Sequence, residues 1–226
     1  MQELLESIIP NVMSRIPEYL KSIGDTLIMV GISGAISFVL GLFFGMVATI
    51  TQRGGILQNL VVYHILDKAI NILRSIPFII LLTWILPVTR AIVGSGIGVK
   101  GAIIPLVAGT VPFFSRQIQS ALAEVNPGVV EAAQAMGLSP MAIIFKVYLR
   151  EGIPSMARAT TLTAISLVGL TAMAGAVGAG GLGDFAIRLG HNRYMEDVTW
   201  VTVITIMLIV TIIQLIGDFV TRKNTH

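Results

Sequence analysis

The sequence has no cysteine and very little charge. Only 12% of its 226 residues are Asp, Glu, Lys or Arg, which is about half the share of an ordinary soluble domain. Without cysteine, the chain is not a disulfide-stapled secreted module. With 54% hydrophobic residues, it is not intrinsically disordered either. These features argue against a soluble enzyme and predict an integral membrane protein with a single domain, residues 1–226.

Signatures of catalysis are missing as well. No stretch reads G-x-x-x-x-G-K-[ST], the loop that holds nucleotide phosphates. His64, His191 and His226 are scattered, and no two of them have the spacing of a metal-ligand pair. No nucleophile, base and metal set is clustered in the sequence. We therefore expect no catalytic residue, no metal site and no cofactor site in this chain.

Long stretches without charge are the main positive signal. A membrane-spanning helix needs about 20 mostly apolar residues. We expect five such spans, in residues 26–52, 75–89, 94–123, 159–183 and 198–217. The second helix is expected to begin near Ala69 and to end before Pro87. Residues 1–20 mix charge with apolar residues and are expected to form an amphipathic surface segment, so the predicted fold is all-α.

The distribution of Lys and Arg favours one orientation. Five spans place the two ends of the chain on opposite sides of the membrane. With the C-terminus inside, nine of the 15 Lys and Arg residues lie in cytoplasmic loops, and the positive-inside rule then favours N-out and C-in. In this orientation Asp184 and the pair Glu196-Asp197 lie in an outer loop. We expect them to be solvated there rather than to act as an acid and base pair.

Small residues within the spans indicate close helix packing. Ser37, Gly41 and Gly45 recur every four residues, a spacing that lets helix backbones approach in lipid. Packing within the chain is the favoured interpretation, and a subunit interface is the alternative. Arg74 is expected to reach the headgroup region with its long side chain, and an ion pair with Asp67 is the alternative.

A glycine-rich stretch ends the fourth predicted span. Gly178-x-Gly180-x-x-Gly183 matches the dinucleotide fingerprint in letters. That fingerprint functions only between a strand and a helix, and here it follows a charge-free span. The glycines therefore predict a tight turn or a close approach of neighbouring helices.

Residues 124–158 are too polar to span a membrane, yet they carry helix signals. Asn126-Pro127 is typical of a helix start, and Gly137 is typical of a helix end. Ser139-Pro140 begins a second helix by the same logic. We expect a cytoplasmic two-helix element. The apolar face of its first helix is expected to contain these residues: Val129, Ala132, Ala133 and Met136.

The residues themselves leave two interpretations of this element open. It is either a plain interfacial loop or a docking surface for a cytoplasmic partner. The residues of this element also resemble a known family. Glu131-Ala132-Ala133 followed by Gly137 resembles the EAA motif in permease subunits of ABC importers. That motif closes with Ile-x-Leu-Pro, whereas residues 147–150 read Val-Tyr-Leu-Arg, so Arg150 replaces the proline. Residues 71–82 and 174–183 resemble the methionine importer branch of the family.

The resemblance implies a function and a set of partners. It implies a homodimeric permease in the bacterial inner membrane, surrounded by lipid, and it implies no nucleic acid. Two ATPase subunits would bind ATP and Mg²⁺, and a periplasmic or lipid-anchored binding protein would deliver L- or D-methionine. Another amino acid or a small organic solute is the alternative substrate, and a secondary transporter is the alternative class. The resemblance assigns ATPase coupling to these residues: Gly128, Val129, Glu131, Ala132, Ala133, Met136 and Gly137.

A further set of residues is expected to line the path or to pack around it. Met173 lies in the middle of the fourth predicted span between two glycines, and methionine fills irregular gaps between helices. The other candidates lie near the second and fourth spans. The full set is Ser75, Pro77, Gly169, Met173 and Gly175.

Overall fold

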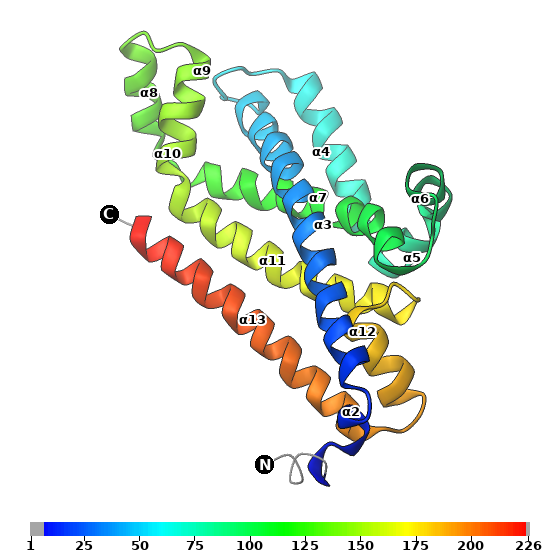
Figure 1. The fold of residues 1–226 in the computed structure, drawn as a ribbon. Helices are drawn as coiled ribbons and strands as arrows, with labels where there is room; N and C mark the ends of the chain where they lie inside the picture. The colour runs from blue at the N-terminus through cyan, green and yellow to red at the C-terminus, as the bar shows by residue number, and fades with distance from the viewer. Residues whose placement is uncertain (1–6, 225–226) are drawn as a thin grey trace. The chain divides into compact units, whose positions relative to one another are not determined.

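A computed structural model describes residues 7–224 of the chain. Residues 1–6 of the predicted amphipathic segment and His226 lie outside the described residues. The described part is entirely helical, in accord with the predicted fold class (Figure 1). In chain order the helices are α2 Pro10–Met13, α3 Ile16–Thr51, α4 Leu60–Ser75, α5 Phe78–Trp84, α6 Leu86–Val93, α7 Gly98–Ala123, α8 Pro127–Ala135, α9 Pro140–Ile143, η1 Ile144–Tyr148, α10 Leu149–Glu151, α11 Ile153–Ala176, α12 Gly181–Phe185, η2 Ala186–His191 and α13 Glu196–Asn224.

Four of these helices, α3, α7, α11 and α13, are long and apolar enough to cross a membrane. They contain 36, 26, 24 and 29 residues and confirm the helices predicted for the first, third, fourth and fifth spans. Several boundaries differ from the prediction. Helix α3 begins at Ile16 rather than near Thr26, α11 covers Ile153–Ala176 rather than 159–183, and α13 continues to Asn224 rather than ending near Gly217.

The prediction of one continuous helix through the second span is wrong. Helix α4 ends at Ser75, Pro77 lies outside any helix with φ −55° and ψ 134°, and the short helices α5 and α6 follow. Proline has no N–H to continue a helix, and its ring disfavours helical geometry at the preceding residue, Ile76. The Ile76-Pro77 pair therefore interrupts the span. Among residues 7–224, four continuous helices rather than five have the length of a span.

The described residues form two compact units. Unit 1 contains residues up to Ala35 together with Ile76–Ala108 and Ala164–Ile213. Unit 2 contains Ile36–Ser75, Gly109–Thr163 and the residues from Gln214 onward.

Unit 1 is built around buried side chains from α3, α5, α7 and α11. Met29, Leu81, Leu106 and Leu167 are members of this core, and each is at most 1% exposed. The turn between α11 and α12 has positive φ at three glycines, and an added Cβ on the fourth, Gly183, would lie 2.3 Å from the carbonyl oxygen of Ala172. The glycines thus provide both the tight turn and the close approach that the sequence predicts.

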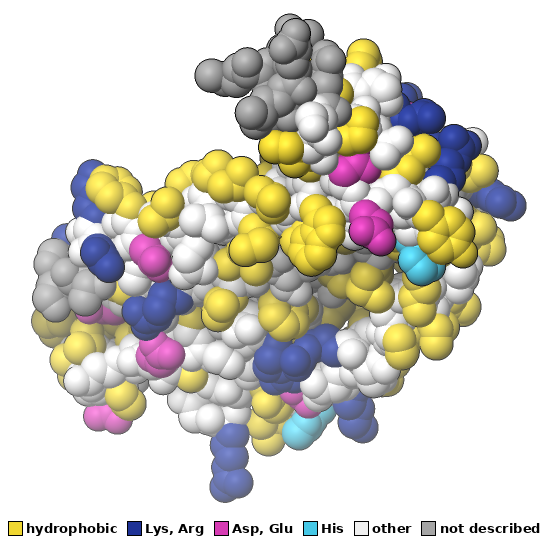
Figure 2. Space-filling model, turned by 90° about the horizontal axis from the view of Figure 1, so that it is seen from below, with side chains coloured by type: hydrophobic (Ala, Val, Ile, Leu, Met, Phe, Trp, Pro, Cys, Tyr) yellow, Lys and Arg dark blue, Asp and Glu magenta, His cyan; other side chains and the backbone are white. Residues whose placement is uncertain are grey.

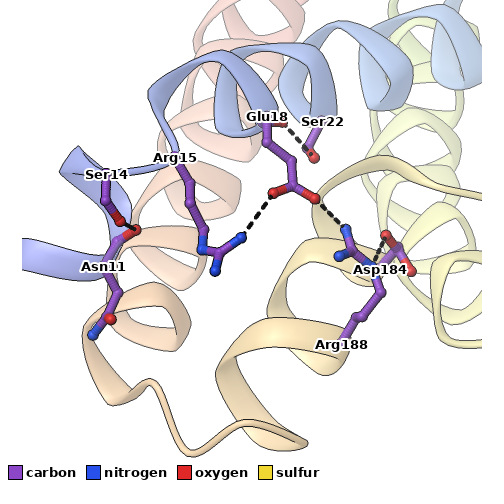
Figure 3. Close-up of polar contacts among 7 residues, drawn as sticks. All are labelled: Asn11, Ser14, Arg15, Glu18, Ser22, Asp184 and Arg188. Carbon is purple, nitrogen blue, oxygen red and sulfur yellow. Dashed lines mark hydrogen bonds and ion pairs between the residues drawn. The ribbon is translucent and has the colours of Figure 1, made fainter.

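A polar cluster fastens the beginning of the described chain to the α12–η2 region of unit 1 (Figure 3). The Arg188 guanidinium donates to Glu18 Oε1 at 2.6 Å and to Asp184 Oδ2 at 3.0 Å. The hydrogen bond to Glu18 raises the pKa of Arg188, and Asp184 adds to this. The backbone and side-chain amides of Asn11 both donate to Asp197 at 2.9 Å. The expectation that these two aspartates serve only as solvated loop charges is therefore wrong, because both hold structural contacts.

Unit 2 is built on the packing of α3 against α7. Phe114 and Ile118 on α7 are at most 1% exposed and contact a core that includes Met46 on α3. A Cβ added to Gly41 would lie 2.5 Å from Phe114 Cδ1, and one added to Gly45 would lie 2.6 Å from the carbonyl oxygen of Ser115. The small residues of α3 therefore pack within the chain, which confirms the favoured interpretation.

Large hydrophobic side chains remain exposed at the surface. On α13, Trp200 and Phe219 are 66% and 67% exposed. Figure 2 shows one face of the molecule, where hydrophobic side chains lie exposed next to one another and between charged ones. A surface this apolar is stable against lipid rather than water.

Candidate functional site

The first helix of the predicted cytoplasmic element, α8, begins where the sequence predicts. Pro127 is its first residue, and Asn126 precedes it as the N-cap. The Asn126 Oδ1 atom accepts a hydrogen bond from the Gly128 N–H at 2.8 Å. This bond satisfies one of the amides that the first turn leaves without a helical partner.

The turn after α8 depends on Gly137. Its φ of +77° lies in the left-handed region, which glycine adopts without steric cost. The Leu138 N–H donates to the carbonyl of Ala133 at 3.1 Å, and the Gly137 N–H donates to that of Gln134 at 2.9 Å. These two bonds form the Schellman motif that ends a helix. The Ser139 hydroxyl then accepts from the Ala142 N–H at 3.3 Å and begins α9, so the predicted helix–turn–helix is confirmed.

The second helix of the element is not a regular α-helix. It runs through α9, a π-helical turn in η1 and the short α10. Arg150, at the position of the family's proline, lies in α10 and is exposed. The chain leaves the helical path only at Gly152, whose N–H still donates to the Tyr148 carbonyl at 3.0 Å. Arg150 therefore lies within the helical path, and the interruption before α11 lies at Gly152.

Helix α8 is apolar on two faces, and the predicted apolar face is largely the exposed one. Val130 and Ala133 point inward and pack against Ile143 and Val147 of the second helix. Of the four residues expected on one face, only Ala133 is buried, whereas Val129, Ala132 and Met136 are exposed. A helical period alone does not choose between two apolar faces, and the choice here follows from contact with the second helix.

We define the hairpin as residues 124–158. Its exposed surface includes large apolar side chains and the carboxylate of Glu131. Met136 is 72% exposed, and Met141 and Phe145 from the second helix are 59% and 62% exposed. Glu131 lies exposed on α8 and makes no hydrogen bond or ion pair within residues 7–224. Exposed apolar side chains next to an unpaired carboxylate suit the binding of another protein surface. The hairpin offers no group of catalytic residues.

A polar clamp closes the base of the hairpin. Glu124, directly after α7, accepts hydrogen bonds from the Ser155 hydroxyl and, at 3.2 Å, from Arg158, both at the beginning of α11. Arg158 also donates to the Ser155 hydroxyl at 2.7 Å. Burial raises the pKa of the Tyr148 phenol inside the hairpin. The clamp joins residues 31 and 34 positions apart, and for this reason the local sequence pattern did not reveal it.

The five path or packing candidates have different environments. In unit 2, Ser75 is exposed and its hydroxyl donates to the Ile72 carbonyl at 2.7 Å. In unit 1, Pro77 is exposed, and Gly169 and Met173 lie on exposed positions of α11. Gly175 is buried, and a Cβ there would lie 2.5 Å from the Asp184 amide nitrogen. Gly175 therefore serves packing, and a path role stays a prediction for the other four.

Comparison with known proteins gives consistent matches over most of the chain. The family model for the "Binding-protein-dependent transport system inner membrane component" matches residues 37–226. The chain is 48% identical over 202 residues to the "Probable D-methionine transport system permease protein MetI" of Vibrio cholerae, which covers 89% of this chain and 90% of that protein. It is 44% identical over 173 residues to the "Methionine import system permease protein MetP" of Bacillus subtilis, which covers 76% and 78% of the two chains.

Solved structures support the same assignment. A chain from "Inward facing conformations of the MetNI methionine ABC transporter: CY5 native crystal form" superposes with a TM-score of 0.90 at 41% identity, covering 94% of this chain and 99% of that chain. A second chain, from an amino acid ABC transporter, is only 15% identical and shows the fold alone, with a TM-score of 0.79. With its EAA hairpin and its apolar helices, this chain belongs to the family of inner membrane components of binding-protein-dependent transport systems.

Proposed function

We propose that this chain is the permease subunit of an ATP-driven importer of methionine in a bacterial inner membrane. The observation that carries the proposal is the exposed hairpin with Glu131 and Gly137, set on a chain of long apolar helices. Relatives named for methionine transport resemble the chain over 89% of its length and support the choice of substrate. Both L- and D-methionine are proposed substrates, and a different amino acid is the alternative.

The hairpin is proposed to receive movement from a partner ATPase. Two copies of this chain, each a single permease domain, would form the path, and each copy would dock one ATPase on the surface around Met136. Because the chain lacks a P-loop, ATP and Mg²⁺ would be bound by the ATPase. The packed pair of helices and the Glu124 clamp make the hairpin a rigid lever attached to α7 and α11. ATP then shifts access only because it binds one state of the transporter more tightly than the other.

The remaining parts of the chain have proposed places in this scheme. The N-out and C-in orientation puts the hairpin and the C-terminal end of α13 in the cytoplasm, as the positive-inside rule favours. A periplasmic or lipid-anchored binding protein would deliver the substrate on the outer side, near residues 90–100 and 184–197. The exposed Gly169 and Met173 positions of α11 are the proposed path-lining sites.

Uptake by reconstituted vesicles tests the proposal. Vesicles that hold this chain with its ATPase, loaded with ATP and supplied with the binding protein outside, are expected to accumulate labelled methionine. Vesicles without internal ATP are expected to show no accumulation, because the chain has no energy source of its own. Competition with unlabelled D-methionine and with other amino acids measures the substrate range. If the vesicles import another amino acid but not methionine, the proposed substrate is wrong. If the purified chain alone binds ATP, the proposal that a separate ATPase binds the nucleotide is wrong.

A further inference from the structure

A second polar network lies in unit 2, away from the hairpin clamp. Arg116, in the second half of α7, donates to Asp67 Oδ1 at 2.6 Å and to Asn71 Oδ1 at 3.0 Å, both on α4. Its other terminal nitrogen donates to Gln119 Oε1 at 2.6 Å, and the Gln119 amide reaches Gln52 Oε1, directly after α3, at 3.4 Å. Asn71 donates in turn to Asp67 Oδ2 at 3.1 Å. We call these five residues the Arg116 network.

The network corrects one of the alternatives considered for the sequence. Asp67 pairs with Arg116, 49 positions away, rather than with Arg74. The side chains of Arg116 and Asp67 are only 25% and 26% exposed. Both terminal nitrogens of Arg116 and both carboxylate oxygens of Asp67 form hydrogen bonds within the network. The pair therefore holds two helices together and does not form an open ligand site.

Helix α4 has little else to hold it. Ile70 is its one buried residue within the described range, and none of the described α4 residues belongs to the hydrophobic clusters of unit 2. Most of its apolar side chains point outward, with Val61, Ile65 and Ile72 63% to 69% exposed. The fixed relation between α4 and α7 therefore depends on the Arg116 network rather than on a shared apolar core.

Helix α7 is also the helix that leads into the hairpin. Leu122, near its end, packs in the core together with Ile144 of the second hairpin helix. Val125, directly after α7, packs in the hairpin core with Val130 and Ala133. A displacement of the hairpin must therefore displace the end of α7, and Arg116 lies two turns before that end.

We propose that the Arg116 network is a positioning device that makes α4 move as one body with α7 and the hairpin during the transport cycle. This inference rests on the proposed function, because the movement is supplied by the ATPase docked on the hairpin. Arg116 and Asp67 act through position only, and neither is assigned contact with substrate. The ion pair is partly buried, and removal of one partner leaves a charge without compensation.

Charge-exchange variants test whether the pair matters as a pair. In the reconstituted complex with ATPase and binding protein, Arg116→Gln and Asp67→Asn are each expected to lower the ratio of methionine imported to ATP hydrolysed by about tenfold. The double exchange Asp67→Arg with Arg116→Asp is expected to recover most of that ratio. Lys68→Gln is the matched control, because Lys68 is the next residue on the same helix, is exposed and has no hydrogen bond or ion pair within residues 7–224. Its ratio is expected to equal that of the unchanged chain.

Distances between spin labels provide a readout that a purely structural role would not change. The chain has no cysteine, so Lys68→Cys on α4 and Lys146→Cys on the hairpin give two specific labelling positions, both exposed. In the complex, the label distance is expected to stay the same with and without ATP when the network is intact, and to change with ATP in Arg116→Gln. An ATP-dependent change with the network intact, or no change in Arg116→Gln, would overturn the inference.

Two further outcomes are decisive. If Arg116→Gln does not assemble, the double exchange replaces it, and an exchange variant that assembles but does not recover the import ratio overturns the inference. If the unchanged complex does not import methionine, the proposed function fails, whereas the label distances still decide whether α4 follows the hairpin. The two hypotheses therefore fail in different measurements.

Discussion

Replacement of Gly137 by valine is expected to abolish methionine uptake by the assembled transporter. Residue 137 has a φ of +77°, a conformation that costs an L residue on the order of 1–3 kcal/mol and is worst for a β-branched one. The space around the glycine is open, since no atom lies within 4 Å of an added Cβ. The expected damage is therefore in the backbone. Valine would break the two hydrogen bonds from Gly137 and Leu138 that end α8.

The consequence for transport follows from the hairpin core. Val130 and Ala133 pack on Ile143 and Val147 only while the turn keeps the two helices together. If the turn is displaced, the two hairpin helices no longer pack as one rigid unit. The ATPase is then expected to be lost from the complex or to hydrolyse ATP without import. Copurified ATPase and the number of methionine molecules imported per ATP measure these two outcomes.

Gly137→Asn is the matched control for this prediction. Asparagine is larger than glycine but adopts left-handed backbone geometry more readily than other residues with a side chain. The Gly137→Asn variant is expected to keep most of the methionine uptake, whereas Gly137→Val is expected to keep almost none. Equal uptake by the two variants would show that the left-handed turn is not what positions α8.

The local parts of this fold could be predicted from the sequence, because caps and turns are determined by neighbouring residues. Asn126 and Ser139 begin their helices and Gly137 ends one, as their side-chain chemistry predicts. The failure at the second span is also local in origin. The Ile76-Pro77 pair carries a helix-breaking signal, but the hydrophobic run around it suggested one continuous helix.

The remaining parts of the site are set by contacts between distant segments. Which apolar face of α8 is buried depends on Ile143 and Val147, and a helical period is silent on this choice. Arg116, the ion-pair partner of Asp67, lies 49 residues away, and Arg188, one of the two partners of Glu18, lies 170 residues away. In a sequence with 12% charged residues, each charge far from a loop needs a partner. That rule predicts that partners exist, but it does not name them.

Two kinds of contact hold the helices together: ion pairs, and close packing at small residues. Arg116 holds α4, which has little apolar core, whereas Arg188 adds an ion pair to the apolar contacts that already hold the beginning of α3. Small residues serve where two long helices share a core, because lipid supplies no hydrophobic force between helices and only close contact stabilises them. The α3 and α7 pair is the clearest case, and it leads to a prediction about stability rather than coupling.

Replacement of Gly45 by valine is expected to destabilise the folded chain strongly. An added Cβ would lie 2.6 Å from the Ser115 carbonyl oxygen and 2.7 Å from Ile118 Cβ on α7. A backbone carbonyl cannot move aside as a flexible side chain does, so the helices must separate. Overpacking of this kind costs about 1–3 kcal/mol or more, and the midpoint of thermal unfolding in detergent is expected to fall by roughly 5–10 °C.

Gly31→Val is the control that isolates the contact between helices. Gly31 lies on the same helix, α3, and no atom lies within 4 Å of an added Cβ. Both substitutions change helix propensity equally, since valine replaces glycine in the interior of one helix in each case. Only the contact with α7 differs, so Gly31→Val is expected to keep the thermal midpoint of the unchanged chain. Equal midpoints for the two variants would mean that close approach at Gly45 does not hold α3 to α7.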